Sequence, residues 1–242
     1  MLKDNKIFED LLKSQEVDYL EIIKKSFIKT YNNEIEYDIN FIVPIFNRIN
    51  FLPPLHKSFK ISSNKSNLNI SITVVEMGSS NQKEYCESNK INYIAIDREF
   101  NKSLAMNFGA LFSINAKSFV FHDVDCLIQE DFFINLFKNI DIKNAKSIQC
   151  FDKRRVLYLN DELTYSVISN DIDINDIDIK TKGIRVGTVG APGGSIYIDK
   201  NIFFEVGGFD PEIFYGHSPE DAFFWEKVEC LIKIHSCDDP IN

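Results

Sequence analysis

The stretch SFVFHDVDC, residues 118–126, decides the fold of this chain. Its apolar part, 119–121, is typical of a buried strand, and Asp123 and Asp125 follow where that strand ends. Alternate residues of an extended chain lie on the same side, so the two carboxylates point the same way. Two carboxylates can hold Mg²⁺ or Mn²⁺ and leave positions for water and phosphate oxygens. The spacing fits equally well a pair of loop aspartates that caps a helix starting near 129–131.

Three similar apolar, β-branched runs precede this strand, at 39–45, 70–75 and 91–96, and helical or polar stretches separate them. Strands that alternate with helical crossovers predict a mainly parallel sheet with helices on both faces. The expected fold class is therefore α/β. In such sheets ligands bind at the carboxyl ends of the strands. Polar or glycine-containing segments follow all four runs, at 44–48, 76–80, 97–102 and 122–125.

A second acidic pair, Glu220 and Asp221, lies at the start of the helical run 222–232. Ser218 can cap that helix, Pro219 suits its first position, and acids in the first turn complement the helix dipole. The pair therefore has an ordinary structural explanation. A helix start that faces the same cleft as the first pair would also supply a carboxylate base able to take a proton from a hydroxyl group.

The chain has 242 residues, with 27 Lys and Arg against 36 Asp and Glu, and a formal net charge of −9. An acidic protein without a long Lys/Arg cluster is unsuited to neutralising a nucleic-acid backbone, so we expect no nucleic-acid partner. No stretch approaches the roughly 18 apolar residues of a membrane span, and the N-terminus lacks the apolar core of a signal peptide. These features predict a soluble intracellular protein without a transmembrane segment.

The cysteines and histidines carry weaker signals. The scattered cysteines form no Cys-x-x-Cys pair, so we expect buried free thiols rather than disulfides or a zinc site. His56 is expected on a helix surface. His122 is expected to bond a strand-end carbonyl, and tuning of a metal at the neighbouring aspartates is the alternative. The aromatic residues around Trp225 are at helical spacing, which indicates core rather than a sugar-stacking surface. The cysteines are residues 86, 126, 150, 230 and 237.

Several short motifs follow one another in a specific order along the chain. Each is common by itself, and their order makes the combination informative. Together they resemble the A-type fold (GT-A) glycosyltransferases, most closely the β-1,4-galactosyltransferase and chondroitin-polymerase-like group, and more loosely family 2 and polypeptide N-acetylgalactosaminyltransferase enzymes. The motifs lie at 43–48, 100–109, 121–125, 193–195, 207–209 and 219–221.

The resemblance implies a nucleotide-diphospho-sugar transferase fold, in which a mainly parallel central sheet is flanked by helices. The catalytic domain would span 37–242, with a nucleotide-binding half at 37–126 and an acceptor-side half at 127–242. Ahead of it, the apolar residues of 4–31 recur close to the 3.6-residue period of a helix. Residues 1–36 are therefore expected to form an N-terminal helical segment packed on the main domain.

The activity implied by the resemblance is metal-dependent transfer of a sugar from a UDP-sugar to a hydroxyl group of a glycan acceptor. Galactose or an N-acetylgalactosamine-type sugar is favoured, the cofactor would be Mn²⁺ or Mg²⁺, and the reaction would invert the anomeric carbon. A cytoplasmic bacterial enzyme that builds capsule or another surface polysaccharide fits best. Peripheral association with the inner face of the membrane is compatible with this assignment.

Carried over by position, the resemblance assigns roles to individual residues. Asp125 would bind the metal together with Asp123, Asp221 matches the base of inverting enzymes, and Glu220 would meet the acceptor beside it. The Trp-Gly-Gly lead into the acidic pair is replaced here by 216–219, so sugar specificity cannot be transferred. The residues expected at the nucleotide and donor sugar are Pro44, Asn47, Arg48, Glu76, Asn101, Lys102, Asn107, Asp123, Gly193 and Gly194.

Two other readings stay open. A sugar-phosphate nucleotidyltransferase would have the same nucleotide-binding sheet. Such an enzyme requires a glycine-rich phosphate loop after the first strand, and 47–51 contains no glycine. A non-catalytic nucleotide- or glycan-binding module is the other reading. It stays open because the family usually adds a third metal ligand, a histidine roughly thirty residues beyond the acidic pair. His235 comes too early for that role, and the sequence ends at Asn242.

Overall fold

The computed structural model describes residues 17–31, 34–113, 115–150, 156–169, 171–173, 176–177, 180–187, 194–214 and 219–236. Its main sheet has eight strands in the order β1-β4-β3-β2-β5-β9-β6-β10. Strands β4, β3, β2 and β5 pair in parallel, whereas β9 runs antiparallel to both β5 and β6. The bounds are β1 Phe27–Lys29, β2 Tyr37–Ile45, β3 Ile70–Met77, β4 Asn92–Ile96, β5 Ala116–His122, β6 Ser147–Gln149, β9 Ser195–Asp199 and β10 His235–Ser236.

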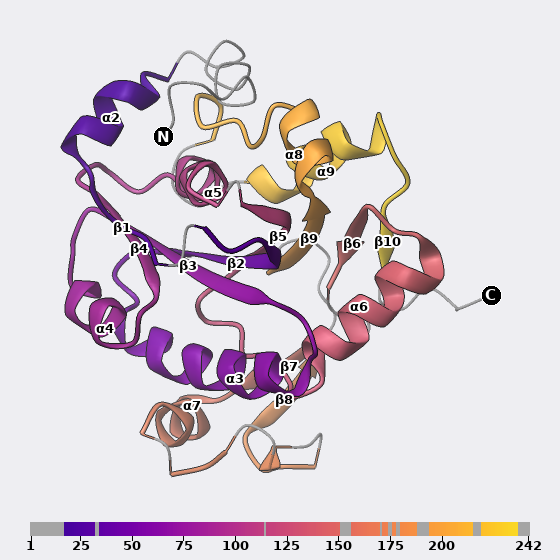
Figure 1. Cartoon of the computed structure of the whole chain (residues 1–242). Helices are drawn as coiled ribbons and strands as arrows, with labels where there is room; N and C mark the ends of the chain where they lie inside the picture. Colours follow the sequence, from indigo (N-terminus) through magenta and orange to yellow (C-terminus); the bar gives the residue numbers. More distant parts are fainter. Residues whose placement is uncertain are drawn as a thin grey trace.

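The helices form a layer on each face of this sheet (Figure 1). Helices α3, α4 and α6 cover one face, and α2, α5, α8 and α9 cover the other. These bounds are α2 Tyr19–Lys25, α3 Leu52–Lys65, α4 Lys83–Ser88, α5 Lys102–Leu111, α6 Phe132–Lys143, α8 Lys200–Glu205 and α9 Glu220–Glu229. The chain also has the 3₁₀ turn η1 Ile49–Phe51, helix α7 Asp161–Ile168 and the antiparallel pair β7 Val156–Leu159 and β8 Ile184–Gly187. The mixed layers confirm the predicted α/β class.

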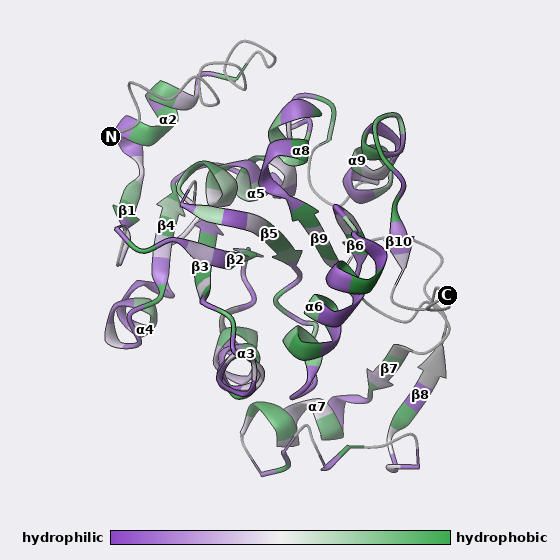
Figure 2. Ribbon diagram, turned by 45° about the vertical axis from the view of Figure 1, so that its right-hand side comes forward, coloured by the Kyte–Doolittle hydropathy of each residue, from purple (hydrophilic) through white to green (hydrophobic). Residues whose placement is uncertain are grey.

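Burial explains why these segments form strands and helices. The central strand β2 is buried along almost its whole length. A parallel strand that helices cover on both faces has a continuous apolar sequence, because both sets of its side chains are buried. In Figure 2 the covering helices carry both hydrophobic and hydrophilic stretches, as amphipathic helices do. Helix α5 approaches β2 closely at Gly109, where an added Cβ would collide with the Ile42 side chain. No helix in the described part of the chain is both long and apolar enough to cross a membrane.

Aromatic side chains fill the core beneath α8 and α9. The rings of Phe209 and Phe224 stack with centroids 4.0 Å apart, and Phe203 meets Phe121 of β5 at 5.1 Å. Offset aromatic pairs of this kind add to the free energy gained by burying apolar area. Phe224 and Trp225 are buried, which confirms that this part of α9 is core.

The N-terminal segment differs in part from the helical segment predicted for residues 1–36. Helix α2 is present and buries Tyr19 and Ile22, but β1 follows it and pairs antiparallel with β4 at the edge of the sheet. Residues 1–16 lie outside the described part of the chain, so the expected helical pattern there is not assessed. The segment thus contributes an edge strand as well as a helix.

The prediction for His56 was wrong. Its side chain is buried between α3 and α4, and its Nδ1 lies 3.0 Å from the hydroxyl of Tyr85. Burial, helped by the nearby Lys60 ammonium, lowers the pKa of His56 to about 4. A neutral imidazole with one phenol partner fits an apolar interior, which the position in the sequence did not reveal.

Candidate functional site

A cavity of about 510 Å³ opens at the carboxyl ends of β2 and β5, next to the start of α9. Four segments that are separate in the sequence meet there. Parallel strands end at the same edge of a sheet, and the antiparallel β9 returns its first residues to this edge. The residues lining the cavity are Pro44, Phe46, Arg48, Phe100, Lys102, Asp123, Val124, Asp125, Pro219 and Glu220.

Lys102 joins both predicted acidic pairs. Its ammonium nitrogen lies 2.9 Å from Oδ1 of Asp123, 3.2 Å from Oε1 of Glu220 and 3.1 Å from Oδ2 of Asp221. The first carboxylate follows β5, and the other two begin α9, almost a hundred residues later. One buried cation therefore brings the strand-end acid and the helix-start acids into a single cluster, hereafter the Lys102 cluster.

The backbone around Lys102 is fixed by its neighbour. Asn101 is the N-cap of α5, because its side-chain oxygen accepts a hydrogen bond from the backbone N–H of Leu104. Its amide nitrogen donates to the carbonyl groups of Pro211 and Phe214. The first residue of the helix is Lys102, so these three bonds set where its side chain starts.

The Lys102 cluster has an unusual charge balance, with three carboxyl groups around one ammonium. Burial raises the pKa of Asp221 to about 6, with Glu220 and Asp123 adding to the effect, while Lys102 opposes it. The pKa of Lys102 is raised: burial alone would lower it, but the charges of Asp123 and Asp221 outweigh burial. A carboxyl group that titrates near neutral pH is suited to accept and release protons.

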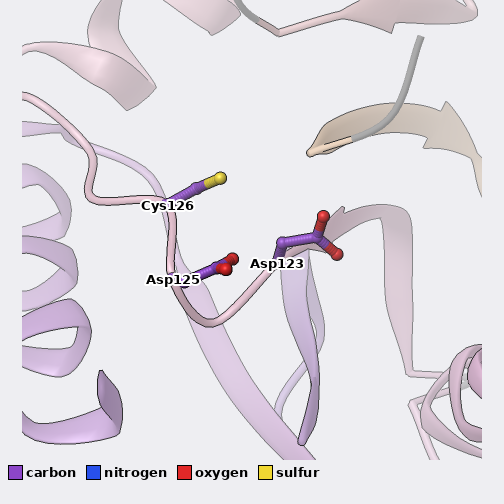
Figure 3. A group of neighbouring side chains, drawn as sticks. All are labelled: Asp123, Asp125 and Cys126. Atoms are coloured by element: carbon purple, nitrogen blue, oxygen red, sulfur yellow. The ribbon is translucent and has the colours of Figure 1, made fainter. Parts of the chain in front are cut away.

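The turn after β5 is held by backbone hydrogen bonds. The N–H of Asp123 donates to the carbonyl of Gly194, 2.9 Å away, and the N–H of Cys126 donates to the carbonyl of Asp123 at 3.1 Å. The Nε2 atom of His122 lies 2.7 Å from the carbonyl oxygen of Cys126, which confirms the strand-end role predicted for this histidine. Figure 3 shows the side chains of Asp123, Asp125 and Cys126 together on this turn.

The two aspartates fit a hard divalent cation. Their carboxylate oxygens and the Cys126 sulfur all lie within 4.8 Å of one another. Carboxylate oxygens are the donors that Mg²⁺ and Mn²⁺ prefer. Asp125 is half exposed and forms an ion pair with Arg48, and Asp123 is bound by Lys102. Both aspartates line the cavity, where a bound divalent cation could neutralise their negative charge.

Sequence comparison decides the family. Residues 57–236 match the sequence model described as "Glycosyltransferase like family 2". The chain belongs to this family. A search of curated proteins finds no match for the chain.

Solved structures share the fold of this family 2-like chain at low identity. The Drosophila β1,4-galactosyltransferase 7 in complex with manganese, UDP-Gal and xylobiose is 14% identical, with a TM-score of 0.54 over 84% of this chain and 66% of that one. The Pyrobaculum calidifontis mannosyltransferase PcManGT, in complex with GDP-Man and Mn²⁺, is 12% identical, with a TM-score of 0.54 over 95% and 63%. S. aureus TarS 1–349 is 17% identical, with a TM-score of 0.55 over 84% and 58%.

These likenesses confirm the predicted GT-A fold. The chain spans less than two thirds of the length of each of these three structures, between 58% and 66%. The family 2-like region at 57–236 contains all four residues of the Lys102 cluster.

An aromatic pair in the family 2-like site received no role from sequence reasoning. The rings of Phe46 and Phe100 stack with centroids 5.1 Å apart and an interplanar angle of 15°, and both line the cavity. Gly78, with a left-handed φ of 74°, turns the chain after β3 beside the Phe46 ring. In the sequence each of the two phenylalanines is a single aromatic residue in the segment after a predicted strand, and nothing local indicated that the two rings would meet.

Asn107, predicted to contact the donor, has a structural role instead. Its side chain is wholly buried, and its amide donates to the Tyr19 hydroxyl and to the Phe209 carbonyl. Its oxygen accepts from the N–H of Phe209. These three hydrogen bonds hold the Asn107 side chain in the core. It does not line the cavity, so the predicted contact with the sugar donor is not supported.

Glu76 and Asn101 are corrected in the same way. The Glu76 carboxylate is fully buried and accepts hydrogen bonds from four groups, so it shapes the loop after β3 and does not reach the cavity. Asn101 is occupied by the three bonds that fix the start of α5. The four donors to Glu76 are the Ser79 hydroxyl, the N–H groups of Asn81 and Gln82, and the Tyr93 hydroxyl.

The remaining predicted site residues are Asn47, Gly193 and Gly194. Asn47 is exposed and takes a left-handed φ of 53°, so it forms the turn before Arg48 and not the cavity wall. Gly194, with a φ of 95°, holds the backbone of Asp123 through its carbonyl. Gly193 and Ser218 lie outside the described residues, and Pro219 is the N-cap of α9.

Proposed function

We propose that this chain transfers a sugar from a UDP-sugar to a hydroxyl group of a glycan acceptor, with inversion at the anomeric carbon and with Mn²⁺ or Mg²⁺ as cofactor. The observation that carries the proposal is the Lys102 cluster, in which one ammonium joins Asp221 to Asp123 and Glu220, two acids that line the cavity. Family membership supplies the reaction class.

Asp221 is the proposed base. In the reaction, the acceptor oxygen forms a bond to the anomeric carbon as the bond from that carbon to the diphosphate breaks, and Asp221 takes the hydroxyl proton. Its pKa of about 6 leaves it mostly ionised at neutral pH. Lys102 holds it in place, and Glu220 accepts from the same ammonium and lines the cavity.

Asp123 and Asp125 are the proposed metal ligands. When bound, the cation would neutralise negative charge that develops on the leaving diphosphate. Manganese is present together with UDP-Gal in the Drosophila relative and with GDP-Man in the Pyrobaculum relative, which supports a metal-bridged nucleotide sugar for this chain as well. Arg48, beside Asp125, is the residue we assign to the nucleotide phosphates.

The nucleotide base is assigned to the open end of the cavity, where Pro44 and the stacked Phe46 and Phe100 give a flat apolar wall. The finer assignment is a galactose or N-acetylgalactosamine-type donor and a role in bacterial surface polysaccharide synthesis. It rests on the sequence resemblance, and a screen of UDP-sugars with hydrolysis as the readout tests the donor part.

Calorimetric titration tests the proposal without knowledge of the acceptor. UDP is titrated into the full chain with and without Mn²⁺, and GDP and CMP serve as controls. We expect Mn²⁺-dependent binding that is selective for UDP and is lost in Asp125→Ala. The matched control is Asp131→Ala, at an exposed aspartate before α6 whose side chain makes no capping bond. Metal-independent binding, or unchanged binding in Asp125→Ala, would contradict the metal assignment.

A further inference from the structure

Cys126 adds a sulfur atom to the two proposed metal ligands. The Cys126 Sγ and the carboxylate oxygens of Asp123 and Asp125 lie within 4.8 Å of one another. Ligand atoms that share one ion, with bonds of about 2.0–2.6 Å, are separated by roughly 3–5 Å. In Figure 3 the Cys126 and Asp125 side chains leave the turn in the same direction. The spacing therefore suits a single ion held by all three side chains.

The position of Cys126 is fixed by bonds that do not involve its side chain. Its N–H donates to Asp123, and its carbonyl oxygen lies 2.7 Å from the His122 ring nitrogen. The intervening Val124 is buried and anchors the turn in the core. The backbone at both ends of the turn is thus held, and the thiol lies within 4.8 Å of both carboxylates.

We propose that Cys126 is the third protein ligand of the divalent ion, so that two carboxylate oxygens and one sulfur bind it. The inference rests on the proposed metal site at Asp123 and Asp125. A sulfur ligand disfavours Mg²⁺, which prefers oxygen, and favours softer ions. The site would accordingly bind Mn²⁺ better than Mg²⁺, and Co²⁺ and Cd²⁺ better than Mn²⁺.

The thiol must lose its proton on binding. Cys126 is exposed and shares its turn with the negatively charged Asp123 and Asp125. A bound dication reverses the sign of the local field, and a coordinating thiol is then deprotonated. The bond formed is metal to sulfur, the bond broken is sulfur to hydrogen, and the proton passes to solvent.

Cobalt absorption spectroscopy tests the sulfur ligand directly. Co²⁺ is added to the full chain in the presence of UDP, and the near-ultraviolet charge-transfer band of a cobalt–thiolate bond is recorded. We expect the band in the natural protein, its loss in Cys126→Ser and its retention in Cys230→Ser. Cys230 is the matched control because it is also an exposed thiol, at the end of α9.

Affinity gives a second readout. Calorimetry should show that Cys126→Ser lowers the affinity for Cd²⁺ by about tenfold or more, as loss of a ligand contact does, and leaves the affinity for Mg²⁺ nearly unchanged. Circular dichroism confirms that the variant is folded.

The outcomes separate the two proposals. If Co²⁺ binds and Asp125→Ala abolishes binding, but the natural protein shows no thiolate band, Cys126 is not a ligand and the two-aspartate site stands. If the band persists in Cys126→Ser, the sulfur comes from elsewhere and the inference is overturned. If no divalent ion binds with UDP present, the proposed function loses its metal site, and this inference fails with it.

Discussion

Two groups of charged side chains in one cavity have the same chemistry and very different surroundings. Arg48 and Asp125 form an ion pair whose side chains are 43% and 37% exposed. In the Lys102 cluster the exposed fractions are 15% for Lys102, 6% for Glu220, 15% for Asp221 and 31% for Asp123. Water solvates the first pair and is largely excluded from Lys102, Glu220 and Asp221.

The difference separates two tasks. An exposed ion pair is held weakly, so its partners can be exchanged for a ligand at little cost in free energy. A buried cluster fixes its groups before any ligand arrives, and the removal of one partner leaves uncompensated charge. We infer that the Arg48 side of the cavity is built for exchange and the Lys102 side for fixed geometry.

The largest effect is expected on turnover from the buried side. Asp221→Asn keeps the shape of the side chain and removes the base, so kcat should fall by about 10²- to 10⁴-fold, the usual contribution of a positioned base. Mn²⁺-dependent UDP binding should be retained, as measured by calorimetry. Glu226→Gln, at an exposed position of the same helix, is the control. A fully active Asp221→Asn enzyme would exclude this residue as the base.

Removal of the shared cation should lower stability. Lys102→Met leaves Glu220 and Asp221 buried without a counter-charge, and the free energy of unfolding should fall by about 3 kcal/mol at pH 8. Lys102 lowers the pKa of Asp221, so its loss raises that pKa further; Asp221 is then protonated as the pH falls, and the loss of stability should shrink at pH 5. Urea unfolding at both pH values measures it. Lys146→Met, which removes an exposed partner of Asp199, should cost less than about 1 kcal/mol at either pH; an equal loss there would remove the contrast.

The pH profile sharpens the same contrast. Burial raises the pKa of Asp221 to about 6, and only the ionised form accepts a proton. The value of kcat/KM should therefore rise through about pH 6 and level off above it. Lys102 opposes the shift, so Lys102→Met should move this limb to higher pH, and Lys102→Arg should leave it nearly in place. A limb that does not move in Lys102→Met would show that Asp221 is not the titrating group.

The smallest effect is expected from the exposed pair. Arg48→Ala should change the free energy of unfolding by less than about 1 kcal/mol, because both side chains are solvated. Its affinity for UDP in the presence of Mn²⁺ should still fall. Denaturant unfolding and calorimetry on one preparation compare the two quantities. A large loss of stability with unchanged UDP affinity would reverse the roles given to the two sides of the cavity.

Much of the sheet could be predicted because a strand that is buried on both faces has a continuous apolar sequence, as β2 and β3 do. The pairing of β9 between β5 and β6 could not, since short strands far apart in sequence carry no sign of their partners. The edge strand β1 was missed for a different reason. Its three residues continue the apolar pattern of the helix before it, so the sequence shows no boundary between them.

The candidate site shows a similar division. Asp123 and Lys102 were found because they follow strand ends, but nothing local indicated that they touch. Asn107 was misassigned because a buried amide that holds the core and an amide that binds a ligand look alike in a sequence. Its partner Phe209 is 102 residues away. Cys126 and Cys230 are exposed, whereas Cys86 and Cys150 are buried as predicted.

The place of β2 in the sheet matters to anyone who prepares fragments of this protein. The region that matches the family begins at residue 57, whereas β2 ends at Ile45 and lies between β3 and β5, pairing with both. A recombinant fragment trimmed to the matched region would lose the central strand of the sheet, together with the Arg48 side of the cavity. It would also lose Tyr19, which accepts a hydrogen bond from the amide of Asn107. An expression boundary that preserves the folded unit therefore has to precede α2.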